Sequence, residues 1–157
     1  MYGGLRDDVA ESIVQTSDGG YALAGYTESF GAGDRDFWLI KTDSFGKLMW
    51  NRTYGGSSTD EARCVVHTSD GGYALAGYTW SFGTGASDFW LVKADSAGNM
   101  QWNKTYGGAS YDWAWSLVQT SDRGYAVAGV TRSFGVGGDD FWLVKTDNNG
   151  NLQWSRT

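Results

Sequence analysis

Proline is missing from this sequence, and cysteine and histidine occur once each, as Cys64 and His67. One cysteine excludes an internal disulfide or a thiolate metal cluster within the chain, and one histidine without a nucleophile nearby argues against a catalytic triad or zinc site. No apolar run approaches the roughly 20 residues of a membrane span, and the start lacks a signal-peptide pattern. The compartment therefore stays unknown.

Positive charge is also scarce. The chain has 12 Lys and Arg against 18 Asp and Glu, which gives a formal net charge of −6, and its basic residues form no cluster. Nucleic acids and anionic membranes are bound through basic surfaces. We therefore expect neither nucleic acid nor a membrane as a partner.

Glycine and aromatic residues are abundant instead. The chain contains 24 Gly, 9 Trp, 9 Tyr and 7 Phe. This mixture favours many short strands joined by glycine turns over helices. The composition predicts an all-β protein.

An internal repeat is the main signal in the chain. The segment TSDGGYALAGYT occupies residues 16–27 and again 68–79, and it returns as TSDRGYAVAGVT at 120–131. The period of 52 residues divides the chain without a gap into the units 2–53, 54–105 and 106–157. A period of this length indicates a repeat architecture with one supersecondary unit per repeat.

Each unit reads as a four-stranded antiparallel meander. In the first unit we expect strands over residues 11–16, 21–27, 36–43 and 47–53. The turn at 17–20 contains Asp18, which can cap the backbone, and Gly19 and Gly20, which we expect at positive φ. The third strand is apolar on both faces, as in a strand that is buried on both sides.

Sheets that are apolar on both faces must stack, and radial stacking gives a β-propeller with one blade per repeat. Small residues such as Ala22, Ala24 and Gly25 suit the crowded region near the axis. A β-helix has shorter repeats, and a trefoil has shorter units with other strand patterns. Three blades are too few to close a ring. We expect a head-to-tail homodimer with six blades, or a trimer with nine, and regard the chain as a piece of a longer or engineered repeat protein.

The end of each unit resembles a known family. The segments WLIKTDSFGKLMW, WLVKADSAGNMQW and WLVKTDNNGNLQW are similar to the tryptophan docking motif of quinoprotein-type propeller blades. The matching residues are Asp43, Gly46, Trp50, Asp95, Gly98, Trp102, Asp147, Gly150 and Trp154. The wider repeat resembles propellers of archaeal and bacterial cell-surface proteins, which implies an extracellular parent protein. A quinone cofactor needs adjacent cysteines, so the resemblance implies the fold rather than the activity.

Variation between the repeats is concentrated at one end of the meanders. The segments before the first strand read LRDDVAE, SSTDEAR and ASYDWAW, whereas the first turns hardly change. Four aromatic residues gather at this variable end: Trp80, Tyr111, Trp113 and Trp115. Exposed rings bind sugars or anchor protein partners. They could equally pack between blades. We predict a non-catalytic scaffold that binds protein, with a carbohydrate-binding propeller as the alternative.

Recurring aspartates are the remaining candidates for chemistry. They begin the first and third strands of each unit, as Asp8, Asp60, Asp112, Asp36, Asp88 and Asp140. A ring of carboxylates could bind a cation, but no calcium-binding loop pattern occurs. We expect these side chains to accept hydrogen bonds from backbone amides instead, and we predict no metal, no cofactor and no catalytic residue. His67 reads as a polar filler, and Asn51 and Asn103 match the glycosylation pattern.

Overall fold

The protein is an all-β chain of three four-stranded antiparallel sheets. The computed structural model describes residues 2–157, and these residues form twelve strands and no helix. The first sheet contains β1 (Asp8–Gln15), β2 (Tyr21–Thr27), β3 (Asp36–Thr42) and β4 (Leu48–Tyr54). The second contains β5 (Asp60–His67), β6 (Tyr73–Thr79), β7 (Asp88–Ala94) and β8 (Met100–Tyr106). The third contains β9 (Asp112–Gln119), β10 (Tyr125–Thr131), β11 (Asp140–Thr146) and β12 (Leu152–Arg156).

The strands follow one another in sheet order, so each sheet is a simple meander, as predicted. The first strand begins three residues earlier than the sequence pattern indicated, because Asp8 pairs with Thr27 at the far end of β2. A bulge between Ala10 and Ser12 breaks the alternation of side chains in β1 and hid this extension. Residues 2–157 contain no helix that is long and apolar enough to cross a membrane.

The first turn of each sheet corrects one prediction. Gly19 has a φ of 80°, as expected, but Gly20 does not take a positive φ. A Cβ at Gly20 would lie 2.2 Å from the carbonyl oxygen of Thr42 and 2.6 Å from Nζ of Lys41. Gly20 is therefore required by the close approach of β3 and not by backbone conformation.

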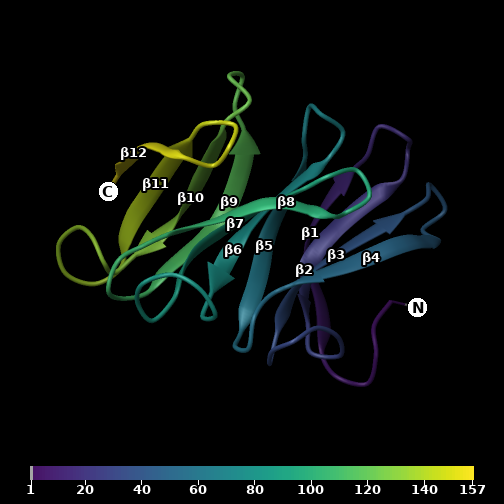
Figure 1. Cartoon of the computed structure of the whole chain (residues 1–157), viewed down its shortest axis with the longest axis horizontal. Coiled ribbons are helices and arrows are strands. Elements are labelled where there is room, and N and C mark those ends of the chain that lie inside the picture. Colours follow the sequence, from purple (N-terminus) through teal and green to yellow (C-terminus); the bar gives the residue numbers. More distant parts are fainter. Residues whose placement is uncertain (1) are drawn as a thin grey trace.

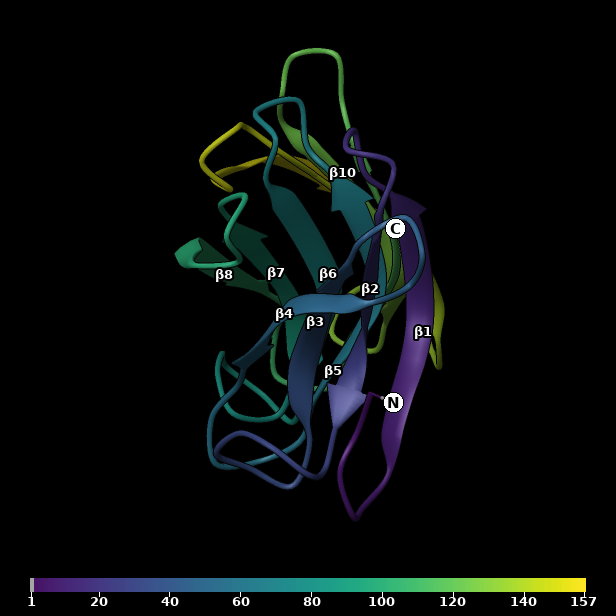
Figure 2. The same cartoon turned by 90° about the vertical axis from the view of Figure 1, so that its right-hand side faces the viewer.

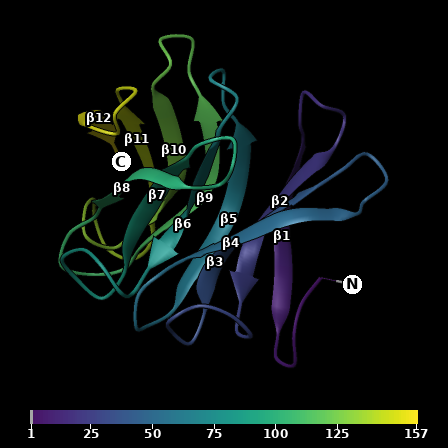
Figure 3. The same ribbon diagram turned by 45° about the vertical axis from the view of Figure 1, so that its right-hand side comes forward.

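The three sheets stack face to face in chain order, and the two ends of the chain lie at opposite ends of the stack (Figure 1). β5 lies against β1, β2 and β3, and β9 lies against β5, β6 and β7. Figure 2 looks at the stack from the side of the first sheet, and Figure 3 shows the sheets fanning apart. Contact between successive first strands gives the repeated module a propeller-like arrangement.

Two hydrophobic cores fill the spaces between the sheets. Each sheet has a Phe face, which carries the phenylalanine of its third strand, and a Trp face, which carries the neighbouring tryptophan. The Phe face of one sheet packs on the Trp face of the next. The Phe faces contain Ala22, Ala24, Phe37 and Leu39 in the first sheet, Ala74, Ala76, Phe89 and Leu91 in the second, and Ala126, Ala128, Phe141 and Leu143 in the third. The Trp faces contain Ala10, Ile13, Tyr21, Leu23 and Trp38, then Ala62, Val65, Tyr73, Leu75 and Trp90, then Ala114, Leu117, Tyr125, Val127 and Trp142.

Burial of the third strand depends on its place in the stack. Every residue of β3 and β7 is buried, as predicted for a strand covered on both faces. In β11 buried and accessible residues alternate. The reason is that no sheet covers the Phe face of the third sheet within residues 2–157.

Candidate functional site

The residues that differ most between the repeats lie at one end of the strands, on the same side of all three sheets. The register pairs Thr27 with both Asp8 and Asp36, so the start of β1, the end of β2 and the start of β3 lie together. We call this end the loop face, formed by residues 2–7, 28–35, 55–59, 80–87, 107–111 and 132–139. Neighbouring sheets are joined here by backbone hydrogen bonds, from Asp60 N to the Arg35 carbonyl oxygen at 2.7 Å and from Asp112 N to that of Ser87 at 2.8 Å.

The structure brings the four predicted aromatic residues together in one continuous row. The ring of Trp80 lies 5.6 Å from that of Tyr111, and Tyr111 lies 5.8 Å from Trp113. Trp113 is in turn 6.4 Å from Trp115, with the two rings nearly perpendicular. We call these four residues the aromatic row. They lie where the second sheet meets the third, because Trp80 follows β6 and the other three belong to or precede β9.

The two ends of the row are more accessible than its middle. Trp80 and Trp115 are 46% and 45% exposed, whereas Tyr111 and Trp113 are half-buried. The indole N–H of Trp113 donates a hydrogen bond of 2.7 Å to Oγ of Ser87 across the boundary between the sheets. Trp113 therefore joins the two sheets and also exposes part of its ring, while the rings of Trp80 and Trp115 are more exposed to solvent.

Two arginines accompany the row and were missed by the sequence analysis. The guanidinium of Arg132 lies 5.8 Å from the ring centre of Tyr111 and 5.9 Å from that of Trp113. Arg63 lies 5.4 Å from the ring centre of Trp115. Contacts of this kind add cation–π attraction to the packing. The signal was present in the repeats, since Arg132 stands at the position that Trp80 occupies one unit earlier.

The corresponding junction between the first and second sheets carries ionic groups instead of rings. Glu61, whose side chain is 3% exposed, receives hydrogen bonds of 2.5 Å from Arg35 and 2.6 Å from Arg63. Arg35 also pairs with Glu28 at 2.8 Å, and Arg63 pairs with Glu11 at 2.6 Å. A buried carboxylate is tolerated when two guanidinium groups compensate its charge. The same backbone thus supports an ionic junction and an aromatic junction.

Titration behaviour follows from these contacts. The hydrogen bonds to Glu61 and Glu28 raise the pKa of Arg35 above its ordinary value. Burial, with a further contribution from the hydrogen bond to Glu61, raises the pKa of Tyr78 to about 12. Both groups therefore keep their ordinary protonation state throughout the physiological range.

The aspartates at the start of the first strands accept hydrogen bonds, as predicted. Asp60 accepts bonds of 2.8 Å from the Gly56 amide and 2.7 Å from the Ser81 hydroxyl, and another from the Thr79 hydroxyl. Asp8 and Asp112 make the equivalent contacts in their own sheets. These carboxylates tie the loop before each first strand to the loop after the second.

Two of the three aspartates that begin the third strands, Asp36 and Asp88, are only partly satisfied. One oxygen of Asp36 accepts amide bonds of 2.8 Å from Ala32 and 3.2 Å from Gly33, but Oδ1 is buried without a partner among residues 2–157. Asp88 has the same orphaned oxygen. Burial raises the pKa of both carboxyls, and Asp60 and Asp112 add to the effect. Across the residues that the structure describes, no group of three or more metal-ligating side chains is present.

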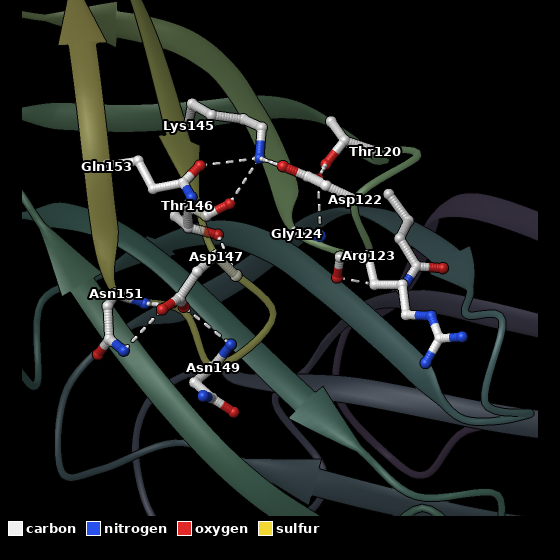
Figure 4. A network of polar contacts seen from close by, with 11 residues as sticks. Thr120, Asp122, Arg123, Gly124, Lys145, Thr146, Asp147, Asn149, Asn151 and Gln153 are labelled. Atoms are coloured by element: carbon white, nitrogen blue, oxygen red, sulfur yellow. Dashed lines mark hydrogen bonds and ion pairs between the residues drawn. The ribbon is translucent and has the colours of Figure 1, made fainter.

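The opposite end of the strands carries, in each sheet, a repeated polar network that the sequence analysis also missed. Figure 4 shows it in the third sheet, where Nζ of Lys145 lies 2.9 Å from a carboxylate oxygen of Asp122 and donates bonds to the Thr146 carbonyl and to Gln153. Lys41 and Lys93 pair with Asp18 and Asp70 in the same way. A groove of about 460 Å³ lies beside the Lys93–Asp70 pair, between the second and third sheets.

The remaining candidates are distributed elsewhere. Asn51 and Asn103 lie on the outer strands β4 and β8, where both are exposed and accept hydrogen bonds from the indoles of Trp38 and Trp90. Glycosylation of these residues stays a prediction. His67 ends β5 and packs 5.6 Å from the ring of Tyr73, at the end of the sheet opposite to the aromatic row.

Comparison with known proteins gives limited guidance. No family model matches the chain. The chain is 28% identical over 138 residues to a protein described as regulatory protein FlaEY, from Caulobacter vibrioides, and the match covers 78% of this chain and 14% of that protein. The chain thus spans a small part of the relative's length. A solved structure of a protein of unknown function from Bacteroides caccae matches 93% of this chain and 66% of that one, with 11% identity and a TM-score of 0.35.

Proposed function

We propose that this chain is a non-catalytic scaffold of the propeller type, which assembles head to tail and binds a protein partner through the aromatic row. The observation that carries the proposal is the continuous contact of Trp80, Tyr111, Trp113 and Trp115, which runs from the loop face onto β9. Two arginines lie over the same rings. Trp, Tyr and Arg are the residues most enriched at the energetic centres of protein interfaces.

Position within the repeats supports a binding role. The residues equivalent to Trp80 are Glu28 and Arg132, and those equivalent to Trp115 are Glu11 and Arg63. The fold therefore accepts charged side chains at both positions and does not require indoles there. Two tryptophans left nearly half exposed at positions of this kind are typical of a surface that binds a partner.

The arginines favour a protein over a sugar. A sugar stacks on the open face of an aromatic ring, but Arg132 lies over Tyr111 and Trp113, and Arg63 lies over Trp115. A peptide can use both groups, because it offers carbonyl or carboxylate oxygens to the guanidinium and apolar side chains to the rings. A carbohydrate ligand remains the second candidate, supported by the exposure of Trp80 and Trp115.

Placement of the reactive side chains supports a non-catalytic role. The single histidine, His67, packs against Tyr73, and the sulfur of Cys64 lies 3.8 Å from the carbonyl oxygen of Leu117. Within residues 2–157, neither His67 nor Cys64 makes a ring contact or a side-chain hydrogen bond with a member of the aromatic row. The name of the Caulobacter relative, a regulatory protein, is compatible with a module that acts by binding.

The test compares the native chain with a variant whose replacements come from its own repeats. Trp80→Glu and Trp115→Glu introduce the residues of the first unit, and Tyr111→Thr introduces that of the second, so the fold should be kept. Both proteins are screened against a random peptide library and a glycan array, and affinities are measured with purified ligands. We expect peptides whose affinity falls at least tenfold in the triple variant and is unchanged in Phe45→Ala.

Two outcomes would contradict this proposal. Glycan binding that depends on the aromatic row would identify a carbohydrate-binding propeller instead. Peptide and glycan binding that is equal in the native chain and the triple variant would remove the row from consideration as a binding site.

A further inference from the structure

The Phe face of the third sheet is complete but uncovered. Phe37 and Phe89 are fully buried between sheets, whereas Phe141, at the equivalent position of the third unit, is 77% exposed. Leu143 is likewise partly accessible, while its equivalents Leu39 and Leu91 are fully buried. The third sheet thus presents the apolar side chains that its two predecessors bury.

The Trp face of the first sheet is the matching surface, because no sheet lies on it within residues 2–157, although Trp38 itself is only 7% exposed and packs against Phe30. Ile13 is 62% exposed, whereas Val65 and Leu117 at the same position are 4% and 3% exposed. A cavity of about 140 Å³ opens on this face, lined by Val9, Ala10, Leu23, Gly25 and Trp38 among others. A cavity of about 150 Å³ is enough to admit benzene.

The equivalent place in the third sheet is filled by a phenylalanine. The tip of the Phe89 ring lies 2.9 Å from the position that a Cβ would take at Gly129, and its ring centre is 4.7 Å from that of Trp142. Gly25 and Trp38 stand at the corresponding positions of the first sheet. The cavity beside them therefore has the position and the lining of a socket for a phenyl ring.

We propose that the Trp face of the first sheet binds the Phe face of the third sheet in a second copy of this chain, so that two copies close into one ring of six sheets. The inference rests on the head-to-tail assembly in the proposed function and identifies its interface. Phe141 of each copy enters the socket beside Trp38 and Gly25 of the other, and the contact occurs twice in the ring.

A second contact fits the same docking. Trp50 lies 5.7 Å from the ring of Tyr73 and packs on Gly98, where an added Cβ would lie 2.7 Å from the indole. Trp102 repeats these contacts with Tyr125 and Gly150. Trp154 is 42% exposed in the third sheet, and Tyr21 and Gly46 provide the matching positions in the first. Docking would cover Trp154 as well as Phe141.

A second copy is the occupant that these surfaces specify. The two uncovered faces differ from each other and lie at opposite ends of the stack (Figure 1), so they form a head-to-tail contact rather than a symmetric one. Such a contact produces a closed ring when the rotation between copies completes a circle. Each face repeats the side chains of an interface already formed twice within the chain.

Disulfide trapping tests the docking directly. Thr59 and Tyr111 form parallel bridges with Arg35 and Ser87 of the preceding sheet, so docking would place Asp7 beside Asp139 of the other copy. In a Cys64→Ser background, Asp7→Cys combined with Asp139→Cys should give a covalent dimer on mild oxidation. Either substitution alone should not give a covalent dimer, because the same residue of the two copies lies in two different interfaces of the ring. Absence of the cross-link, equal cross-linking of the single variants, or an open ladder of longer products would overturn the proposal.

Phe141→Asp supplies the second measurement, because this exposed side chain can be changed without disturbing the fold of one chain. We expect the variant to have the 17.1 kDa mass of a single chain, whereas Phe45→Asp, at a turn residue that is 95% exposed, keeps the dimer. A Phe141→Asp dimer would overturn the proposal. The Phe141→Asp variant keeps the aromatic row, and we expect the triple variant of that row to keep the dimer. Failure of the assembly can therefore be distinguished from failure of partner binding.

Discussion

The phenyl ring of Phe37 meets the indole of Trp90 edge to face, with 4.5 Å between the ring centres and 62° between the planes. Phe89 repeats this contact with Trp142 at 4.7 Å and 59°. The two pairs lie in different cores and come from consecutive repeats. One sequence pattern therefore forms the same contact each time a sheet is stacked on the next, and aromatic pairs in this geometry contribute beyond the area they bury.

The position of a phenylalanine in the stack should decide its contribution to stability. We expect Phe89→Ala to lower the free energy of unfolding by about 3–5 kcal/mol, because a fully buried ring is lost and a cavity remains. Phe141→Ala should change it by less than about 0.5 kcal/mol in the isolated chain, because this ring is exposed. Both values can be measured by urea denaturation at a protein concentration low enough for the copies to dissociate. Equal losses would show that the Phe face of the third sheet is covered within one chain.

The first glycine of the second repeat, Gly55, should not tolerate a side chain. A Cβ at Gly55 would lie 1.7 Å from Oδ1 of Asp36 and 2.9 Å from Oδ2 of Asp60. We expect Gly55→Ala to cost about 1–3 kcal/mol of stability, as overpacking does. Gly138→Ala is the matched control, since an added Cβ there meets nothing within 4 Å. Thermal or urea unfolding of the two variants is the measurement, and a stable Gly55→Ala variant would contradict the packing described here.

Stability should depend on the protonation of Asp36. Burial raises the pKa of this carboxyl above its ordinary 3.8, so the folded state holds the proton more tightly than the unfolded state. The stability linked to that proton is present below pH 3.8 and is lost as the pH rises through the folded pKa. Asp36→Asn removes this loss. We therefore expect the stability of the variant relative to the native chain to increase from acidic to neutral pH in urea titrations.

A suitable control for this experiment is Asp34→Asn, because Asp34 is exposed on the same loop. This variant measures the effect of replacing an exposed carboxyl of that loop. A stability difference for Asp36→Asn that does not change with pH would mean that the buried carboxyl of Asp36 does not take up a proton.

Asp70 should have the opposite pH dependence. Burial tends to raise its pKa, but hydrogen bonds from Thr68, Lys93 and Gly72 outweigh that effect and lower the pKa to about 2. The stability from Asp70 is therefore present above the ordinary pKa of 3.8 and is lost as the pH falls through about 2. We expect Asp70→Asn to destabilise the chain at neutral pH and to have no effect below pH 2. A double-mutant cycle with Lys93→Met isolates the pair, and zero coupling would contradict its assignment.

Much of the fold could be predicted because the repeat removes ambiguity. The segment YALAGYT forms β2 and β6 with the bounds that the pattern indicated, since a run of mostly apolar and small residues follows turn residues directly. The start of β1 was harder to predict, because the bulge after Ala10 shifts the alternation. The pairing of Lys41 on β3 with Asp18 joins a strand residue to a residue of the turn between β1 and β2, and the pattern of a single element does not reveal it.

The candidate site could be predicted in part. Comparison of the repeats located the four members of the aromatic row, because variable positions at the same end of each unit lie on one surface. The comparison did not reveal that Arg63 and Arg132 cover the rings, since that depends on how a flexible side chain folds back. It also did not reveal the orphaned oxygen of Asp36, which depends on the sheet that follows.

The mass of the unmodified chain in solution tests the central claim most directly, because every sheet in this account must be covered on both faces. Native mass spectrometry, supported by light scattering at micromolar concentration, should give twice the 17.1 kDa of one chain. A particle of 17.1 kDa at all concentrations would contradict the account, since the Phe face of the third sheet and the Trp face of the first would then be stable in water without a partner.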